Sequence, residues 1–329
     1  MIDFSNARLQ PFQAFHAFHE RINVHIKVAN AAALLLVRHA GDPTLRDQLA
    51  DLIVSSHPSW NAPPVRDLTV DVQRAQDSAI SAFALMAVFS AFDDFLIGTE
   101  AEISRGLGAG NSKRVEIDDS QSTEDDAEAE EEKVDRVFRL YEAMSWTTVR
   151  IEMLQPLLRY FRLCRNCIAH RNARASKALA EQSTDPEILV SLGTLQEGPE
   201  RSLMTFIVNE DIHIPPTLAI MSSHVLRLIA IDVNDKLVST LGLDGILRSV
   251  AHHSVRLNDE LGGKARKRPE AIVNAFLTKS RIRLGSRHES IAEMKRVGIW
   301  TPYLKAITRG ATTSKRGDKK RKARGDNAV

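Results

Sequence analysis

The sequence predicts a mostly α-helical protein. Apolar residues recur at helical spacing in several long segments, and clusters of proline and glycine separate those segments. The chain has 329 residues, of which 43% are apolar, so it is long enough to bury a sizeable core in one or two domains. Its two cysteines exclude a disulfide scaffold and fit a reducing compartment.

Three helices are predicted in the first third of the chain, over residues 10–38, 44–55 and 67–104. Gly41-Asp42-Pro43 ends the first helix, and Pro63-Pro64 separates the second from the third. The third helix carries one apolar stripe at helical spacing, made of Leu85, Phe89, Phe92 and Leu96.

The helical pattern resumes at Val134. An apolar stripe then begins at Ile151, and its member after Phe161 is Arg165. Because Pro156 lies inside this stripe, we expect a kink or a new helix start near residues 153–155.

Residues 174–216 lack a helical period, and within them Met204–Val208 and Ile212–Ile214 predict a short β-hairpin. An amphipathic helix follows over residues 218–241 and is closed by Gly242. Two shorter helices are predicted in the basic C-terminal region, at 269–283 and 287–297.

Charge is sorted along the chain, although its net value is only +2. Residues 252–329 hold 20 Lys and Arg against 7 Asp and Glu, a local net of +13, so residues 1–251 carry −11. Residues 118–132 contribute nine acids and no base, a composition too polar to order itself. We therefore predict a disordered acidic insertion at 106–131 and a disordered basic tail at 309–329. The insertion is either a solvated loop, which we favour, or a decoy that covers a basic site.

Residues 161–176 read FRLCRNCIAHRNARAS and contain Arg165-Asn166-Cys167-Ile168-Ala169-His170 near the end of a helix. This R-N-x-x-x-H pattern resembles the motif of the HEPN superfamily, small helical bundles that are often RNA-cleaving toxins and antiviral effectors in bacteria. The segment Ala87–Leu96 is similar to that family's first bundle helix, where an acid commonly sits at the position of Asp93. The resemblance covers about residues 67–243.

The resemblance implies a HEPN-like antiparallel helical bundle with a metal-independent endoribonuclease site and no cofactor. Arg165 and His170 would be its catalytic residues, assisted by Asn166 and Asp93. Family members usually assemble the site across a two-fold dimer, so the resemblance implies a homodimer. They often have glycine where this chain has Ala173, so the turn after the motif departs from the family's pattern.

These residue types fit RNA cleavage by attack of a 2′-hydroxyl on the neighbouring phosphate. Imidazole accepts a proton near neutral pH, and guanidinium is a permanent cation for the charge that builds on the phosphorane. In a regular helix Arg165 and His170 are about 140° apart, so either the helix ends at the motif or the arginine side chain wraps around it. Asn166 shares a face with His170 and could orient the imidazole or bind phosphate. Asp93 could fix the tautomer of His170 or hold Arg165.

Structural interpretations stand beside these catalytic ones. Arg165 continues an apolar stripe and could be a buried, paired arginine. His170 could be satisfied by the helix macrodipole, and Asp93 by solvent. The residues that follow the motif are predicted to contact phosphate or, alternatively, to solvate a loop. They are Arg171, Asn172 and Arg174.

Other cysteines and histidines could bind a metal or react, but their sequence context predicts that they pack in the core. Cys164 and Cys167 form a C-x-x-C without the second pair that zinc requires, so we expect two small buried hydrophobes and no metal. His16, His19 and His25 are expected to pack with phenylalanines of the first helix.

Cations of the C-terminal region are predicted to contact the phosphates of nucleic acid. They are Lys295, Arg296, Lys319, Lys320, Arg321 and Lys322. Trp300 is expected instead to close a small helical core, with nucleic-acid stacking as the alternative.

The sequence thus predicts an N-terminal helical extension (1–65), a HEPN-like bundle (66–243), a basic helical region (252–308) and the basic tail. The function it favours is a toxin or antiphage endoribonuclease that acts on RNA. The alternative is an inactive nucleic-acid-binding or regulatory subunit, with an antitoxin or sensor as its partner. The N-terminus lacks the basic-then-apolar order of a signal peptide, so we expect a cytoplasmic protein with no membrane partner.

Overall fold

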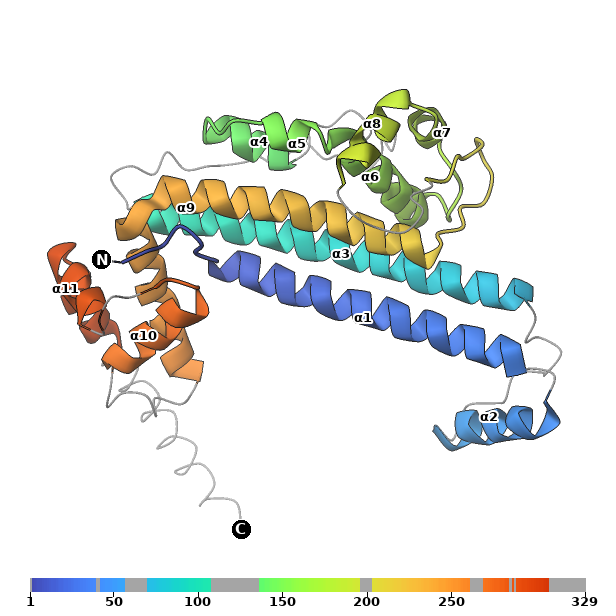
Figure 1. Ribbon diagram of the computed structural model, residues 1–329, viewed down its shortest axis with the longest axis horizontal. Coiled ribbons are helices and arrows are strands. Elements are labelled where there is room, and N and C mark those ends of the chain that lie inside the picture. The colour runs from blue at the N-terminus through green and yellow to red at the C-terminus, as the bar shows by residue number, and fades with distance from the viewer. Residues whose placement is uncertain are drawn as a thin grey trace, which may run out of the picture. The chain divides into compact units, whose positions relative to one another are not determined.

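The computed structural model describes residues 2–39, 42–56, 70–107, 136–195, 203–260, 269–283, 286 and 288–307. Its described part is mostly helical (Figure 1). The helices are α1 (Gln10–His39), α2 (Pro43–Ser56), α3 (Val70–Leu107), α4 (Arg136–Ala143), α5 (Val149–Glu152), α6 (Gln155–His170), α7 (Lys177–Ser183), α8 (Pro186–Thr194), α9 (Pro216–Glu260), α10 (Pro269–Lys279) and α11 (Glu289–Arg296). Residues 300–307 are also helical.

The chain forms two compact units. Unit 1 comprises Met1–Ala14, Phe95–Ile117 and Ile231–Val329, and unit 2 comprises Phe15–Asp94 and Asp118–Ala230. The boundaries predicted from the sequence at residues 65 and 243 remain a prediction. The acidic insertion and the basic tail lie almost wholly outside the described residues.

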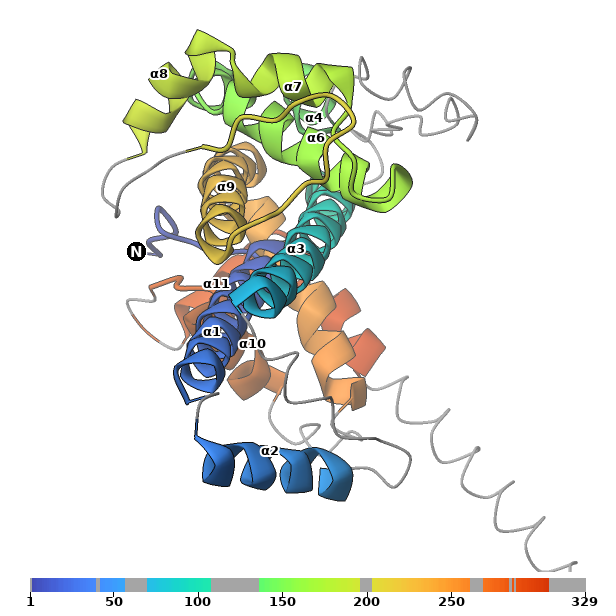
Figure 2. The ribbon, with the colours of Figure 1, turned by 90° about the vertical axis from the view of Figure 1, so that its right-hand side faces the viewer.

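Unit 2 is built on the neighbouring parts of α1, α3 and α9, which run side by side (Figures 1 and 2). The apolar stripe of α3 faces this core, since Leu85, Phe89 and Phe92 are all buried. Phe92 packs edge-on against Phe15 of α1, with ring centroids 5.7 Å apart. The predicted stripe is therefore confirmed as the core-facing side of α3.

The remainder of unit 2 is a group of shorter helices in which α6 contacts α5, α7 and α8. The predicted restart near Pro156 is confirmed, because α5 ends at Glu152 and α6 begins at Gln155 with the proline in its first turn. Leu157, Leu158 and Phe161 bury the inner face of α6.

Two expectations for residues 174–216 were wrong. The first is the absence of helix, because Ser176 caps α7 through a bond from the Leu179 amide, and Asp185 caps α8 through one from Glu187. Asp185-Pro186 was a readable start signal, with a capping carboxylate followed by proline at the first helical position.

The second is the β-hairpin, since no described residue of 203–215 forms a strand. Strand-like alternation arises there because Phe206, Ile212 and Ile214 point into the core while the chain stays extended. Apart from a turn in which the Glu210 amide donates to the Ile207 carbonyl, its backbone bonds go to other segments and include a bridge between Asp211 and Arg174.

In unit 1, Gly242 interrupts α9 with φ 56° and ψ −171°, so the helix predicted to end there is followed by a further helical stretch to Glu260. Nearby, the chains approach so closely that a Cβ on Gly106 would lie 2.4 Å from Cδ2 of Leu241. Asn234 ties the N-terminal segment to α9, accepting from the Leu9 amide and donating to the Ala7 carbonyl.

The C-terminal helices complete unit 1, where α10 contacts α11. Trp300 is 9% exposed and Met294 is fully buried, so the small helical core predicted around this tryptophan is confirmed. The Tyr303 hydroxyl donates to the Pro269 carbonyl at 3.0 Å and fastens residues 300–307 to the start of α10.

Two helical stretches are long and apolar enough to cross a membrane by length and composition alone, Asp77–Leu107 and Pro216–Leu257. In their most apolar windows, 44% and 56% of the residues are buried within the protein.

Candidate functional site

The R-N-x-x-x-H motif occupies the C-terminal end of α6, which stays helical through His170. Because the helix does not end before the histidine, Arg165 and His170 leave its axis about 140° apart. Arg165 Nη1 donates to Oδ1 of Asn166 at 3.0 Å. The guanidinium thus bends around the helix toward the face that Asn166 shares with His170.

The three motif side chains differ in exposure. Arg165 and Asn166 are half-buried, and His170 is exposed. His170 makes no side-chain hydrogen bond or ion pair with any part of the chain that the structure describes. The structure therefore brings Arg165 and Asn166 together and leaves the imidazole accessible beside them.

The turn after the motif is tight and contains no glycine. Asn172 and Ala173 both adopt left-handed backbone conformations, with φ of 51° and 58°. The Ala173 amide donates to the Cys167 carbonyl at 3.1 Å and closes the helix end. An L side chain is strained at positive φ, so glycine would suit the position that Ala173 occupies.

Cations surround this turn. Arg174 is exposed, and its Nε lies 3.8 Å from the Asp211 carboxylate. Arg171 caps α6, and its Nε is buried without a hydrogen-bond partner among the described residues. Asn172 is exposed. These three of the nine residues predicted to contact phosphate all lie within four positions of His170.

A second chain segment, residues 203–215, lies along the same turn. The Asn209 amide donates to the Ala175 carbonyl, the Ala175 amide donates to the Glu210 carbonyl, and the Ile212 amide donates to the Ala173 carbonyl, over 2.7–2.9 Å. The sequence contained no signal for this contact, which joins residues 34 or more positions apart, since backbone pairing leaves no side-chain pattern.

Asp93 is exposed on α3. Its carboxylate is not among the hydrogen-bond or ion-pair partners of Arg165 or His170 within the described residues. The role predicted for Asp93, to fix the tautomer of His170 or to hold Arg165, therefore stays a prediction.

The basic C-terminal candidates have mixed surroundings. Lys295 is exposed at the end of α11. Arg296 is instead engaged by two acids, Glu293 and Asp244, the latter at 2.7 Å. Two carboxylates balance the charge of this guanidinium, which makes Arg296 less available to a phosphate than an unpaired arginine. The remaining candidates, Lys319, Lys320, Arg321 and Lys322, lie outside the described residues.

The two cysteines and His19 of α1 are buried, whereas His25 is exposed, so the packing predicted for His25 was wrong. Cys164 and Cys167 are buried free thiols, and burial raises the pKa of Cys164 well above its ordinary value. His19 Nδ1 lies 2.6 Å from the Ser223 hydroxyl of α9. Burial, assisted by the charge of Arg227, lowers the pKa of His19 to about 4, so its imidazole is neutral at pH 7.

Unit 1 contains a buried ionic cluster that the sequence did not reveal. Glu102 is fully buried and accepts from His253 and, at 2.6 Å, from Arg105. The ring of His253 stacks on Phe276, with centroids 5.8 Å apart. Burial opposes ionisation, but bonds from His253 and Ser249 with the charges of His253 and Arg105 lower the pKa of Glu102 below its ordinary value.

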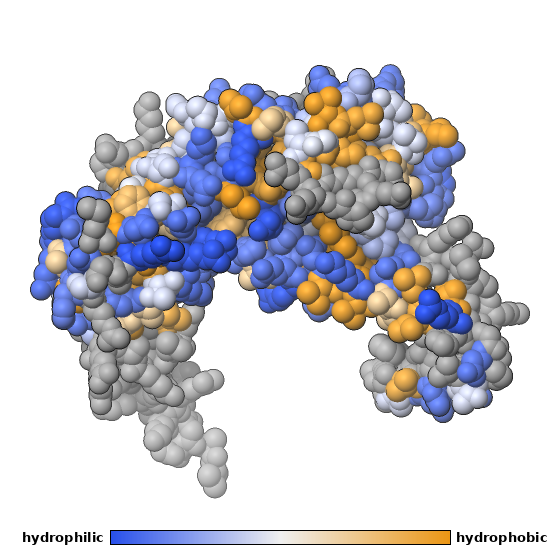
Figure 3. Space-filling view, viewed as in Figure 1, coloured by the Kyte–Doolittle hydropathy of each residue, from blue (hydrophilic) through white to orange (hydrophobic). Residues whose placement is uncertain are grey.

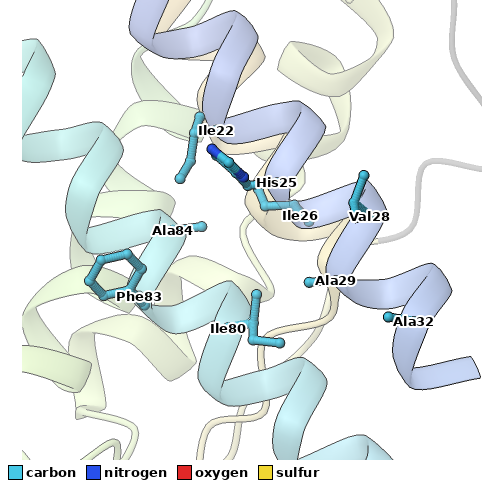
Figure 4. Close-up of a pocket in the computed structure, with 9 residues that line it drawn as sticks. All are labelled: Ile22, His25, Ile26, Val28, Ala29, Ala32, Ile80, Phe83 and Ala84. Carbon is cyan, nitrogen blue, oxygen red and sulfur yellow. The ribbon is translucent and has the colours of Figure 1, made fainter. Parts of the chain in front are cut away.

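A hollow of about 340 Å³ lies between α1 and α3 of unit 2 (Figure 4). Its walls include Ile22, His25 and Ile26 of α1 and Ile80, Phe83 and Ala84 of α3. His25 is the single titratable side chain among these residues, and none of the motif residues lines the hollow. A catalytic pocket needs several convergent polar groups, so we do not assign it to the site.

Comparisons with protein-family models, with curated proteins and with solved structures find no match to this chain. The chemistry of the site is therefore judged on its residues and their geometry.

Proposed function

We propose that the protein is a metal-independent endoribonuclease of the HEPN type, whose site lies at the C-terminal end of α6. The observation that carries this proposal is the pairing of Arg165 with Asn166 beside His170, which is exposed and has no side-chain partner among the described residues. In that part of the chain the Arg165 guanidinium is not neutralised by an acid, so its charge is available to a phosphate.

His170 accepts the proton of the 2′-hydroxyl as that oxygen attacks phosphorus, and the product is a 2′,3′-cyclic phosphate. Arg165 stabilises the charge that develops on the phosphorane oxygens, and Asn166 positions its guanidinium. Arg171 and Arg174 hold the flanking phosphates. DNA lacks the nucleophile, so the substrate is RNA.

We propose further that two copies complete the site. The HEPN superfamily that the motif resembles usually assembles its site across a two-fold dimer, so Arg165 of one protomer would act with the histidine of its partner. Large apolar side chains are exposed near α6: Leu189 and Val190 on α8 are 68% and 73% exposed, and Ile207 is 64% exposed. Orange side chains gather over α7 and α8 at the upper right of Figure 3. An apolar surface of this kind suits a homodimer contact.

Cleavage of a labelled RNA oligonucleotide in EDTA tests the activity. We expect the wild type to leave 2′,3′-cyclic phosphate ends, and Arg165→Ala and His170→Ala to lower the rate by about 10²–10⁴-fold. His288→Ala is the matched control, because that histidine is exposed at the start of α11 and its side chain caps nothing. Equal cleavage by all four proteins, or a need for a metal ion, would contradict the proposal and leave the inactive RNA-binding subunit as the better account.

Mixing the two inactive variants tests the composite site. If Arg165 acts with the partner's histidine, a heterodimer of R165A and H170A regains one intact site and part of the activity. Leu189→Asp with Val190→Asp should yield an inactive monomer by light scattering, whereas Leu52→Asp on α2, also at an exposed leucine, should leave the dimer intact. Full activity in the monomer would refute the shared site.

The cellular role we propose is that of a toxin or antiphage effector. Growth arrest on expression should then follow cleavage across the same variants. If expression of H170A arrested growth as severely as expression of the wild type, the toxicity would not depend on this site.

A further inference from the structure

His213 is held rigidly within the segment that lies along the turn after the motif. On one side, the Ile212 amide donates to the Ala173 carbonyl at 2.7 Å. On the other side, the Ile214 amide donates to the Ser78 hydroxyl of α3 at 3.0 Å. The backbone of His213 is therefore fixed from both directions.

The side chain of His213 has no role in packing. Ile212 and Ile214 are 4% and 1% exposed, and in an extended segment the residue between two buried ones points to the opposite side. His213 is exposed accordingly and makes no side-chain hydrogen bond, ion pair or ring contact within the described residues. The fold therefore fixes the position of this imidazole although its side chain makes no contact that stabilises the described part of the chain.

His213 also lies within reach of the motif. It adjoins Ile212, which bonds to Ala173, and Ala173 is three residues after His170. The turn of residues 171–173, one hydrogen-bonded pair of chains and one further residue limit the separation of the two histidine Cα atoms to about 20 Å. Two imidazole side chains and a phosphodiester between them can span such a separation.

RNA cleavage by a 2′-hydroxyl requires two proton transfers. The 2′-oxygen loses a proton as its bond to phosphorus forms, and the 5′-oxygen gains one as its bond to phosphorus breaks. His170 accounts for the first transfer. Arginine does not serve the second, because guanidinium does not release its proton at neutral pH.

We propose that His213 is the general acid of this reaction. Its imidazolium donates a proton to the departing 5′-oxygen while His170 takes the proton of the 2′-hydroxyl. The two histidines then exchange protons with water, so no metal or other co-reactant is consumed. This assignment rests on the proposed ribonuclease activity.

Two matched oligonucleotides test it, one natural and one with sulfur in place of the 5′-oxygen at the mapped cleavage position. A thiolate leaves without protonation, so loss of a general acid hardly affects the sulfur substrate. We expect His213→Ala to slow cleavage of the natural RNA by about 10²-fold or more and that of the sulfur RNA by less than about tenfold. H170A should slow both.

His213→Gln, which keeps size and polarity, should behave like the alanine variant, and His288→Ala should match the wild type on both substrates. The pH profile supplies a second readout, because H213A should lose the fall in rate on the basic side. Equal slowing of both substrates, or no slowing of either, overturns the assignment while the ribonuclease activity stands. A wild type that cleaves neither RNA overturns the proposed function itself, and this assignment with it.

Discussion

Two histidines in this chain have opposite surroundings. His170 of unit 2 is exposed at the end of α6 and has no side-chain partner in the described residues, whereas His253 of unit 1 is buried, stacked on Phe276 and bonded to Glu102. Burial with a carboxylate makes an imidazole part of the fold. Exposure beside a half-buried arginine leaves an imidazole free to react, so surroundings rather than residue type separate the two roles.

The largest effect on stability should come from His253→Ala. Removing this side chain leaves the charge of buried Glu102 with one fewer donor, and breaking a buried pair costs about 3–5 kcal/mol. Urea unfolding measures the difference. His252→Ala, at the exposed neighbouring histidine, is the control, and H170A should unfold like the wild type. If H253A and H170A lost similar free energy of unfolding, the structural role assigned to His253 alone would be wrong.

An intermediate effect should follow from pH through His19, which resembles His253 in being buried. Its folded pKa of about 4 lies below the ordinary value of 6.5, so the unfolded chain binds the proton more readily. Neutral, buried His19 therefore contributes to the free energy of unfolding fully above pH 6.5. The contribution is lost as the pH falls toward 4, by about 3 kcal/mol in total.

Most carboxylates titrate below about pH 5, so urea titrations at about pH 7.5 and about pH 5.0 largely leave their charge unchanged. Through His19, the free energy of unfolding should differ by about 2 kcal/mol between these two pH values. His19→Gln, which can keep a bond to Ser223, should flatten that difference, and H170A should not. A wild type equally stable at the two pH values would show that His19 is not protonated on unfolding.

The smallest effect concerns the turn that carries the motif. Ala173 is strained at φ 58°, so Ala173→Gly should stabilise the protein by about 1 kcal/mol, as measured by thermal unfolding. Ala175→Gly is the matched control, because Ala175 is buried without positive φ and its replacement should destabilise. A destabilising A173G would mean that the methyl group is needed for packing.

Most of the periodic helices could be predicted from the sequence to within a few residues, because each buries an apolar stripe. The stripe on α3 and the restart at Pro156 are examples. The helical stretch of α9 beyond Gly242, which runs to Glu260, and the helix at residues 300–307 were missed. The short α7 and α8 were missed since they span too few turns for a period, although Asp185-Pro186 signalled the start of α8. The prediction of a hairpin was wrong because alternate side chains of residues 203–215 point into the core, and any extended segment that packs on a core shows this alternation.

For the site, local sequence was sufficient to predict that the R-N-x-x-x-H motif lies near the end of a helix. It could not predict that the turn pairs with the 203–215 segment, nor that Arg296 is engaged by Asp244, which is 52 positions away. Contacts between distant segments are set by tertiary packing, and a single sequence carries no record of them.

The course of the three long helices has a consequence for dissecting the protein. The chain passes from one unit to the other within α1, α3 and α9, at residues 14–15, 94–95 and 230–231, all inside regular helix. A truncation that isolates either unit must therefore sever helical hydrogen bonds in three places. Calorimetry on the intact chain should record one cooperative melting event, and fragments cut at those positions should not fold independently.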